Sequence, residues 1–222
     1  MSGTQLENNL VSISGKILTT PAFSHEVYGE SFYTMNVSVQ RLSDSYDIIP
    51  VMFSERLVAP EDFVIGFFVI VEGQFRSYNN FNSADGHKLM LTVFAREITL
   101  SEEEVDGKHP NEIVLNGYVC RKPMYRTTPF GREIADVLIA VNRSYNKSDY
   151  IPCIAWGRNA RYANNFTVGD NIRVWGRIQS RSYQKRVSET ESEERIAYEV
   201  SIAKMEVVKD GVSETYSEHE TV

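Results

Sequence analysis

The residues of this chain best suited to chemistry lie in one alternating stretch, DNIRVWGRIQSRSYQKR, at positions 170–186. Successive strand residues point to opposite faces, so the apolar residues of its first half share one face. The other face carries only basic, aromatic and amide side chains: Arg173, Trp175, Arg177, Gln179, Arg181 and Tyr183. Such a face can neutralise phosphates and stack planar bases, as single-stranded nucleic acid binding requires. The alternative is a solvent face whose Trp175 packs under a loop or at a subunit interface.

Motifs for catalysis are absent from the sequence, which has no Gly-x-Ser-x-Gly, no phosphate-binding loop and no His-Glu-x-x-His. The four histidines are scattered and have no metal-ligand spacing with cysteine or carboxylates. Asp47 and Asp149 are each expected to satisfy a turn before a strand rather than to act as a base. Cys120 and Cys153 are expected to be small buried apolar residues, with a disulfide left open. We therefore expect no enzyme, no metal and no cofactor.

The chain contains one pattern twice. Sliding the sequence by 102 positions, and by 103 after position 50, aligns Asn9/Asn111, Gly15/Gly117, Pro21/Pro123, Gly29/Gly131, Val39/Val141, Arg41/Arg143, Asp47/Asp149, Ile49/Ile151, Pro50/Pro152, Gly66/Gly169, Val71/Val174 and Gly73/Gly176. A period near 100 residues is too long for a solenoid repeat and indicates two copies of one domain. The predicted organisation is a first domain at 1–100, a linker at 101–110, a second domain at 111–208 and an acidic flexible tail at 209–222.

Each copy has the pattern of five strands with a short helix between the third and fourth. In the second copy we expect strands near 111–122, 133–143, 149–156, 171–182 and 195–208, with the helix within 158–166. In the first copy we expect strands near 9–20, 30–41, 47–53, 67–78 and 88–99, with 55–63 in the helix position. This order is that of the OB-fold, a small Greek-key barrel. The predicted fold class is all-β, with two tandem OB-folds.

Glycine and proline positions add detail to this fold. Gly15 and Gly117 fall inside long first strands, where a barrel strand must bend sharply. Pro50 and Pro152 fall inside third strands, where proline cannot donate to the ladder, so we expect a bulge or an unpaired donor position.

Charge is distributed unevenly between the two copies. The whole chain has a net charge of −7, which taken alone argues against a polyanionic partner. From 111 to 183, however, eleven Lys and Arg against five Asp and Glu give +6, whereas from 1 to 105 six against fourteen give −8. The second copy is therefore predicted to be the main nucleic-acid-binding domain, and the first to bind more weakly or to serve in assembly.

The second copy resembles the bacterial single-stranded DNA-binding proteins of replication and repair. The matching elements, in order, are NEIVLNG (111–117), KPMYRTTPFG (122–131), IADVLIAVNR (134–143), DYIPCIAWG (149–157) and GDNIRVWGRIQSRSY (169–183). The first copy shares the resemblance more faintly, through the internal repeat. The resemblance implies a sequence-tolerant single-stranded DNA binder with four OB-folds per particle, which for this chain is a homodimer.

That family stacks bases on a few aromatic rings, and its positions fall here on Tyr145, Tyr150, Trp156 and Tyr183. Trp175 lies outside those positions and is a separate candidate. Tyr150 and Trp156 share one face of SDYIPCIAWG with Pro152 and Ile154, and we expect Ile154 to form an apolar floor between the rings. The predicted phosphate-binding residues are Arg121, Lys122, Arg126, Arg143, Arg173, Arg177 and Arg181. The equivalent stacking positions of the first copy hold Ser43, Ile48, Phe53 and Tyr78, and we predict a weaker secondary site of Phe53, Arg76 and Tyr78.

Two other readings stay open. An accessory or assembly subunit of a primosome, conjugation or phage complex would bind nucleic acid weakly, and RNA could occupy the same surface. The chain ends SETYSEHETV, which lacks the Pro-Phe tip through which the family recruits replication and repair proteins, so recruitment by that route is doubtful. The acidic loop 187–194 lies beside the proposed groove. With neither a secretory signal nor an apolar run long enough to span a membrane, we expect a cytoplasmic, nucleoid-associated protein without a membrane partner.

Overall fold

The computed structural model describes residues 8–41, 43, 45–80, 88–104, 110–186 and 192–208. Half of the predicted linker (105–109), most of the acidic loop (187–191) and the predicted tail (209–222) lie outside these residues. The first domain contains β1 (Asn9–Ile17), β2 (Ala22–Val27), β3 (Glu30–Gln40), β4 (Tyr46–Ser54), the short 3-10 turn η1 (Pro60–Asp62), β5 (Phe68–Asn80) and β6 (Lys88–Ser101). The second contains β7 (Asn111–Val119), β8 (Met124–Thr127), β9 (Glu133–Arg143), β10 (Lys147–Trp156), α1 (Arg158–Ala163), β11 (Asn171–Arg186) and β12 (Ser192–Val207).

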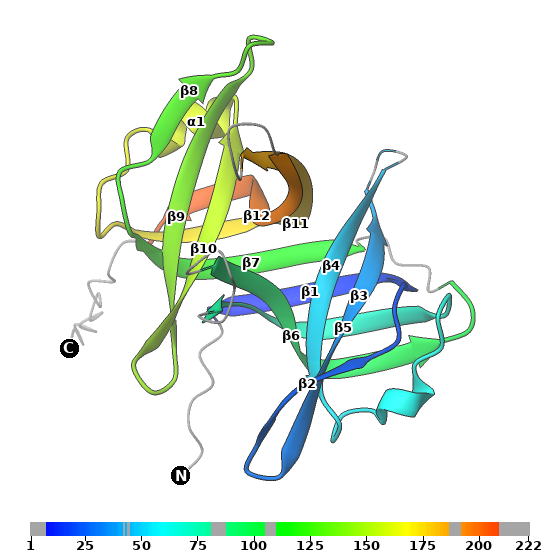
Figure 1. Ribbon diagram of the computed structural model, residues 1–222. Helices are drawn as coiled ribbons and strands as arrows, with labels where there is room; N and C mark the ends of the chain where they lie inside the picture. Colours follow the sequence, from blue (N-terminus) through cyan, green and yellow to red (C-terminus); the bar gives the residue numbers. More distant parts are fainter. Residues whose placement is uncertain are drawn as a thin grey trace, which may run out of the picture.

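Each half of the chain folds into one barrel, and Figure 1 shows the two side by side. The strand order is β2-β3-β4-β6-β5-β1 in the first and β7-β11-β12-β10-β9-β8 in the second. The additional pairings β3–β1 and β7–β9 close the barrels around inward-facing Val, Ile and Leu side chains. The prediction of two tandem OB-folds is therefore confirmed.

Two local predictions differ from the structure. Each barrel has one more short strand than expected, β2 or β8, which pairs with the edge of β3 or β9. The helix between the third and fourth strands forms in the second domain as α1, but the first domain has only the three-residue turn η1. Pro60 begins that turn, and a proline cannot supply the backbone donor that a longer helix through this position would need.

The glycines of the two first strands stand where each barrel closes. A Cβ atom on Gly117 would lie 2.4 Å from the carbonyl oxygen of Ala140, and one on Gly15 would lie 2.1 Å from that of Ser38. Both neighbours belong to the strand that completes the barrel, β9 or β3. Only glycine permits so close a crossing of two backbones.

The prolines of the third strands cause no bulge. Pro50 pairs in register with Asn36, and Pro152 with Leu138. On the other side of these strands, pairing is recorded only from the residue after each proline, at Val51↔Val93 and Cys153↔Val200. Each proline thus stands just before the second ladder begins, which agrees with the expected unpaired donor position.

The two cysteines are not bonded to each other. Cys153 is buried in the core, as expected, whereas Cys120 is partly exposed after β7. Burial raises the pKa of both thiols. The prediction of a buried residue is therefore wrong for Cys120.

The barrels join through their first strands, which continue one sheet across the molecule. β1 and β7 pair antiparallel, with Val11 opposite Ile113 at the centre of the register. The two halves of this junction match, because Asn9 exchanges two hydrogen bonds with the backbone of Phe75 (2.8 and 2.9 Å) and Asn111 does so with Ile178 (2.7 and 2.9 Å). The repeat in the sequence is thus a pseudo-twofold pair in space.

Two buried aspartates hold each domain against the other. Asp149 accepts a hydrogen bond from the backbone N–H of Ser77 in the first domain (2.9 Å), and the Tyr150 N–H donates to Ser77 Oγ (2.8 Å). At the equivalent place of the pseudo-twofold pair, Asp47 accepts a hydrogen bond from the backbone N–H of Ser180 (2.6 Å). Both aspartates were expected to satisfy local turns. Their interdomain role was missed because it depends on how the barrels pair.

Replacing Asp149 with Ala is expected to lower the free energy of unfolding by about 2–4 kcal/mol, since it leaves a buried N–H unsatisfied and the Arg143 guanidinium without its carboxylate. Urea unfolding followed by far-UV circular dichroism measures the effect. Asp136→Ala is the control, because its carboxylate pairs with Arg126 at the surface (3.1 Å) and should contribute about 1 kcal/mol or less. Equal losses would contradict the interdomain role of Asp149.

Candidate nucleic-acid interface

Strand β10 separates a core face from an open face. Ile151, Cys153 and Ala155 are almost completely buried, whereas Tyr150 is 49% exposed and Trp156 39% exposed. This division matches the alternation of the sequence. Ile154 differs from expectation: it is only 6% exposed, so it packs beneath the surface rather than forming an open floor.

Two further aromatic rings extend from neighbouring segments. Tyr145 is 94% exposed in the tight β9–β10 turn, where Tyr145 and Asn146 both have positive φ angles (62° and 55°). Tyr183 is 38% exposed on the β11–β12 arm, and the Arg181 guanidinium lies 5.7 Å from the centre of its ring. All four predicted stacking rings therefore have accessible surface.

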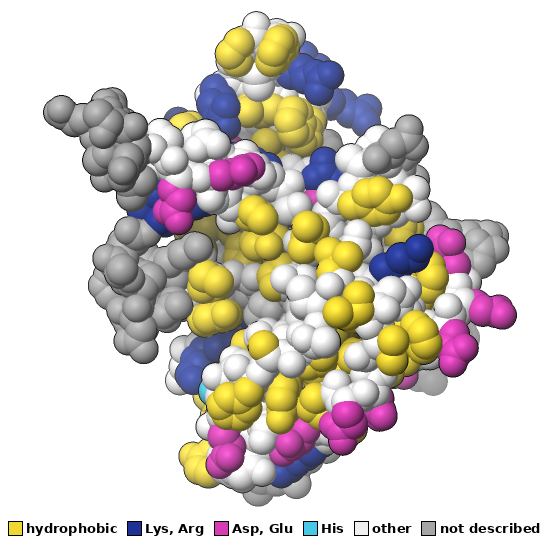
Figure 2. All heavy atoms as spheres, turned by 45° about the vertical axis from the view of Figure 1, so that its right-hand side comes forward, with side chains coloured by type: hydrophobic (Ala, Val, Ile, Leu, Met, Phe, Trp, Pro, Cys, Tyr) yellow, Lys and Arg dark blue, Asp and Glu magenta, His cyan; other side chains and the backbone are white. Residues whose placement is uncertain are grey.

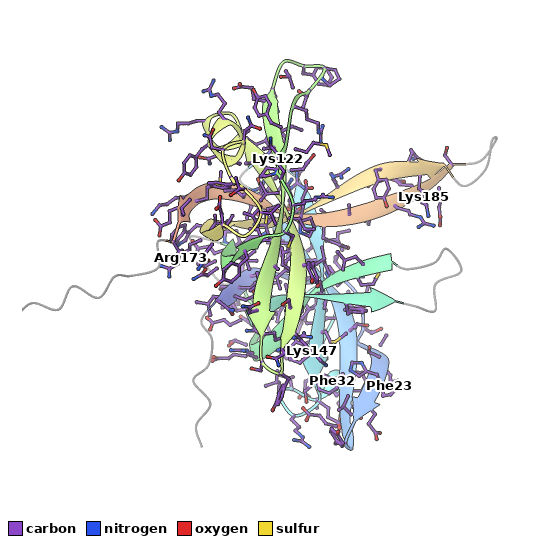
Figure 3. The ribbon with its side chains drawn as sticks, turned by 90° about the vertical axis from the view of Figure 1, so that its left-hand side faces the viewer. Phe23, Phe32, Lys122, Lys147, Arg173 and Lys185 are labelled. Carbon is purple, nitrogen blue, oxygen red and sulfur yellow. The ribbon has the colours of Figure 1, made fainter. Side chains whose placement is uncertain are left out.

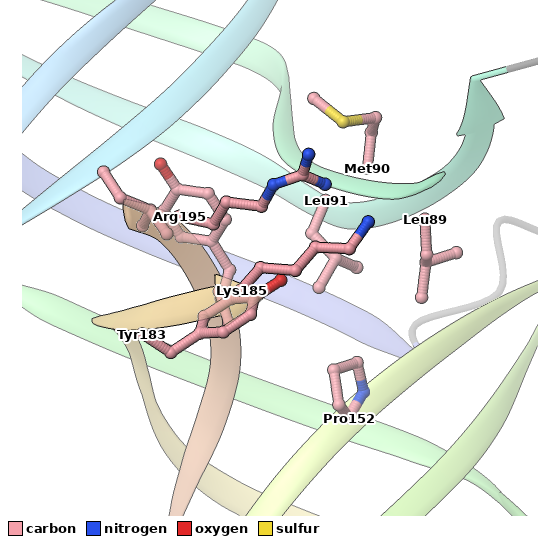
Figure 4. Close-up of a pocket in the computed structure, with 10 residues that line it drawn as sticks. Leu89, Met90, Leu91, Pro152, Tyr183, Lys185 and Arg195 are labelled. Carbon is pink, nitrogen blue, oxygen red and sulfur yellow. The ribbon is translucent and has the colours of Figure 1, made fainter. Parts of the chain in front are cut away.

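An apolar groove runs between the outer face of β10 and the first domain. Its volume is about 360 Å³. In Figure 4, Pro152 comes from β10, Tyr183, Lys185 and Arg195 from the β11–β12 arm, and Leu89, Met90 and Leu91 from β6 of the first domain. The first domain thus supplies a wall of the groove that borders the predicted stacking face. Sequence reasoning missed this wall because nothing in the stretch KLML (88–91) distinguishes a groove wall from a core strand.

A basic pocket of about 410 Å³ lies farther along the same domain junction. It is lined by Asn8, Gln74, Arg76, Arg96, Asn142, Arg143, Ser144, Tyr145 and Lys147. Burial, followed by the charge of Arg143, lowers the pKa of the Arg76 guanidinium to about 10. Arg76 was predicted to act with Phe53 and Tyr78, but the structure places it beside Arg143 of the second domain.

The prediction for Phe53 is wrong. Its ring is completely buried and packs against Phe63 (4.6 Å between centroids) and Tyr33 (6.0 Å). Phe53 falls on the core-facing alternation of β4, opposite to the alternation that Trp156 occupies on β10, so it offers no face to a base. Tyr78 is 42% exposed on β5, where it pairs with Met90 of β6. Because Phe53 is buried, Arg76 and Tyr78 do not form a joint site with it.

Several predicted phosphate-binding cations are engaged with carboxylates. Arg126 pairs with Asp136 (3.1 Å), Arg181 with Glu199 (3.5 Å) and Arg143 with Asp149 (3.6 Å). Arg177 reaches across the junction to Asp47 (3.5 Å). Arg121 and Lys122 are exposed on the loop before β8, with no carboxylate partner among the described residues.

Arg173 and Trp175 lie elsewhere on the molecule. Trp175 pairs with Val114, which in turn pairs with Leu10, so these residues share the open face of the central sheet. The Lys204 ammonium sits 4.3 Å from the Trp175 ring centre. Eight residues of strand separate Trp175 from Tyr183, roughly 25 Å along an extended chain. Figure 3 accordingly shows Arg173 and Lys185 on opposite sides of the molecule.

The charge asymmetry of the sequence is visible on the surface. On the face in Figure 2, acidic side chains gather mainly over the first domain in the lower part, while Lys and Arg are prominent at the top, over the second. No helix within the described ranges is long and apolar enough to cross a membrane. Among the same residues, no cluster of His, Cys, Asp and Glu could hold a metal ion.

Comparison with known proteins agrees with this geometry. Residues 110–208 match the family described as the single-strand binding protein family. The chain is 38% identical over 83 residues to single-stranded DNA-binding protein 1 of Staphylococcus aureus (34% of this chain, 50% of that one). It is 35% identical over 83 residues to single-stranded DNA-binding protein A of Bacillus subtilis (34% and 48%). The chain thus spans about half the length of the curated relatives it matches.

The match to the single-strand binding protein family thus covers the second domain. For both domains together, the crystal structure of the wild-type single-stranded DNA binding protein from Thermus aquaticus superposes with a TM-score of 0.71, covering 91% of this chain and 94% of that one. At 21% sequence identity this likeness concerns the fold, and it extends over both barrels.

The burial difference between Phe53 and Tyr145 gives a direct test of the site geometry. Phe53→Ala is expected to lower the free energy of unfolding by about 3–5 kcal/mol, because it empties a core position. Tyr145→Ala removes a ring of similar size from the surface and should change it by about 0.5 kcal/mol or less. Urea denaturation of both variants measures the difference. If Phe53→Ala leaves the free energy of unfolding unchanged, Phe53 is not a core residue.

Proposed function

We propose that this protein binds single-stranded DNA without sequence preference, mainly through its second domain. The observation that carries the proposal is the open face of β10 with its flanking segments, where four aromatic rings keep accessible surface beside several cations. The names of the related proteins, single-stranded DNA-binding proteins, support the same ligand.

The division of labour follows from the chemistry of the side chains. Tyr145, Tyr150, Trp156 and Tyr183 would stack on bases, each contributing about 1–3 kcal/mol, and any base can stack because every base has a flat face. Phosphates would be neutralised by Arg121, Lys122, Arg126, Arg143 and Arg181. DNA would replace the carboxylates that hold Arg126 and Arg181, whereas Asp149 would stay behind Arg143. Arg173, Arg177 and Trp175 lie apart from these rings or hold the junction, and have a lesser place in the proposal.

Titration with an oligo-dT strand, followed by tryptophan fluorescence and by anisotropy of a labelled strand, tests the proposal. If about four phosphates are neutralised, the logarithm of affinity should fall with the logarithm of salt concentration at a slope of roughly −3. Trp156→Ala with Tyr183→Ala should weaken binding by at least about thirtyfold, because two stacking surfaces are lost.

The matched control replaces two exposed rings of the first domain, Phe23→Ala with Tyr28→Ala, which are 61% and 102% exposed. Their loss should leave the affinity nearly unchanged. Equal weakening by both pairs of substitutions would contradict a main site on the second domain. Absence of binding at low salt would refute the proposed function and leave the assembly-subunit alternative. If an RNA strand of matched sequence displaces oligo-dT, the ligand is RNA rather than DNA.

We further propose that two copies of the chain associate through the open face of the central sheet, giving four OB-folds. Leu10, which is 44% exposed, and Val114 lie side by side at the centre of that face with Trp175 next to them. We also propose that the protein has partners in replication or repair and that it is cytoplasmic and associated with the nucleoid.

Sedimentation equilibrium of Leu10→Glu with Val114→Glu tests the association. A charge on each of two neighbouring strands at the centre of the proposed interface should convert the dimer to a monomer. Val64→Glu, an exposed apolar residue in the loop after η1, is the control and should remain dimeric. A wild-type chain that sediments as a monomer would overturn the proposed association.

A further inference from the structure

The basic pocket draws its charge from both domains. Arg76 of β5 and Arg96 of β6 come from the first domain, and Arg143 and Lys147 come from the β9–β10 hairpin of the second. The lining contains no carboxylate among the described residues. Asp149 lies behind Arg143 at 3.6 Å but already accepts the Ser77 N–H. Four cations thus line one space that has no carboxylate in its own described lining, so the pocket is positive. Arg96 also borders an adjoining hollow lined by Glu72, Glu97 and Glu112.

Arg76 is held in a fixed position. Its Nε and Nη2 atoms both donate to Gln74 Oε1 (3.2 and 2.9 Å), and its guanidinium lies 3.7 Å from the centre of the Phe94 ring. The two hydrogen bonds to Gln74 use two of the five N–H donors of Arg76. Among the described residues the other three donors have no recorded acceptor, so Arg76 is a rigid, partly buried donor group that can receive an oxygen-rich anion.

Holding like charges together is unfavourable without an anion. Burial and the neighbouring charges of Arg143 and Arg96 lower the pKa of Arg76, and the charge of Asp149 acts in the opposite direction. A bound anion would remove this cost and satisfy the open donors. An oxygen-rich anion therefore complements the charges and donors of this junction.

The opposite junction of the pseudo-twofold pair lacks this arrangement. By the repeat offsets and the strand registers, Arg76 corresponds to Gln179, Arg96 to Ala203 and Lys147 to Ser45. Its two remaining arginines, Arg41 and Arg177, both reach the buried Asp47 (2.6 and 3.5 Å). The basic pocket thus has four cations where the other junction has two. This excess cannot be attributed to the needs of domain pairing, since the other junction pairs without it.

We propose that the basic pocket is a composite phosphate site, in which Arg76 and Arg96 of the first domain and Arg143 and Lys147 of the second grip one backbone phosphate of single-stranded DNA. This inference rests on the proposed function. Tyr145, in the β9–β10 turn, is part of the pocket wall, and Tyr150 follows on β10. A DNA strand anchored here could therefore place its next bases on these rings. The first domain, although acidic overall, thereby becomes part of the binding site.

The test measures the salt dependence of oligo-dT binding for Arg76→Gln with Arg96→Gln. The control, Lys16→Gln with Arg56→Gln, removes the same charge from exposed positions of the first domain. Relative to this control, the pocket variant should bind about tenfold more weakly, as expected for lost charge-assisted hydrogen bonds. Its salt slope should be shallower by about 0.7 if one phosphate contact is lost.

A second measurement uses sodium tripolyphosphate, a chain of phosphates without bases, in thermal unfolding of the full chain. It should stabilise the wild type and the control variant, but not the pocket variant. Stabilisation of all three to the same extent would overturn the phosphate site. Selective stabilisation by tripolyphosphate with an unchanged oligo-dT slope would mean that the pocket takes an anion other than DNA, which also overturns the proposal.

The outcomes separate this site from the proposed function. If the wild type binds oligo-dT and the Trp156 and Tyr183 substitutions weaken it, but the pocket variant equals its control, only the composite site fails. If the pocket variant loses affinity while the ring substitutions do not, the stacking account fails and the phosphate site stands. A wild type that does not bind oligo-dT refutes both.

Discussion

The antiparallel pairing of β1 with β7 is the constraint on which the rest of this structure depends. It joins two barrels edge to edge, so that the exposed edge of each first strand is covered by the other domain rather than left open. Because the pairing is centred on Val11 and Ile113, it fixes the rotation of one barrel relative to the other. Asp47 and Asp149 then fasten each domain to a strand of its neighbour, at Ser180 and Ser77.

This pairing also determines where a ligand can lie. It brings the β5–β6 arm of the first domain alongside β10 of the second, where Leu89–Leu91 face Pro152 and Arg76 reaches Arg143. Two domains that are symmetric in their backbones thereby form a junction that is asymmetric in charge. The basic side of that junction is the one that borders the open aromatic face, so stacking and phosphate binding adjoin each other.

Features that depend on local pattern were predictable from the sequence. The internal repeat and its alternating strands sufficed for two OB-folds, and alternation alone separated Tyr150 and Trp156 from the core face of β10. Phe53 was misplaced because aromatic type was given more weight than its position in the alternation of β4. The additional strands β2 and β8 are short and have no buried residue, so they carry no apolar alternation that would reveal them.

Features that arise between the domains could not be predicted in this way. The roles of Asp47 and Asp149, the apolar groove wall and the position of Arg76 all depend on residues more than 60 positions apart in the chain. The repeat offset does contain part of this information, since pairs that differ between copies, such as Arg76 and Gln179, mark where the two junctions diverge. Without the β1–β7 register, however, nothing shows that Arg76 faces the second domain.

Photo-crosslinking of the full chain to an oligo-dT strand carrying 5-iodouracil, with the attachment sites mapped by mass spectrometry, tests the central claim most directly. The account predicts crosslinks to Tyr145, Tyr150, Trp156 and Tyr183, all on the second domain beside the junction. Crosslinks concentrated on Phe23 and Tyr28 of the first domain, or on Trp175 of the central sheet, would contradict it.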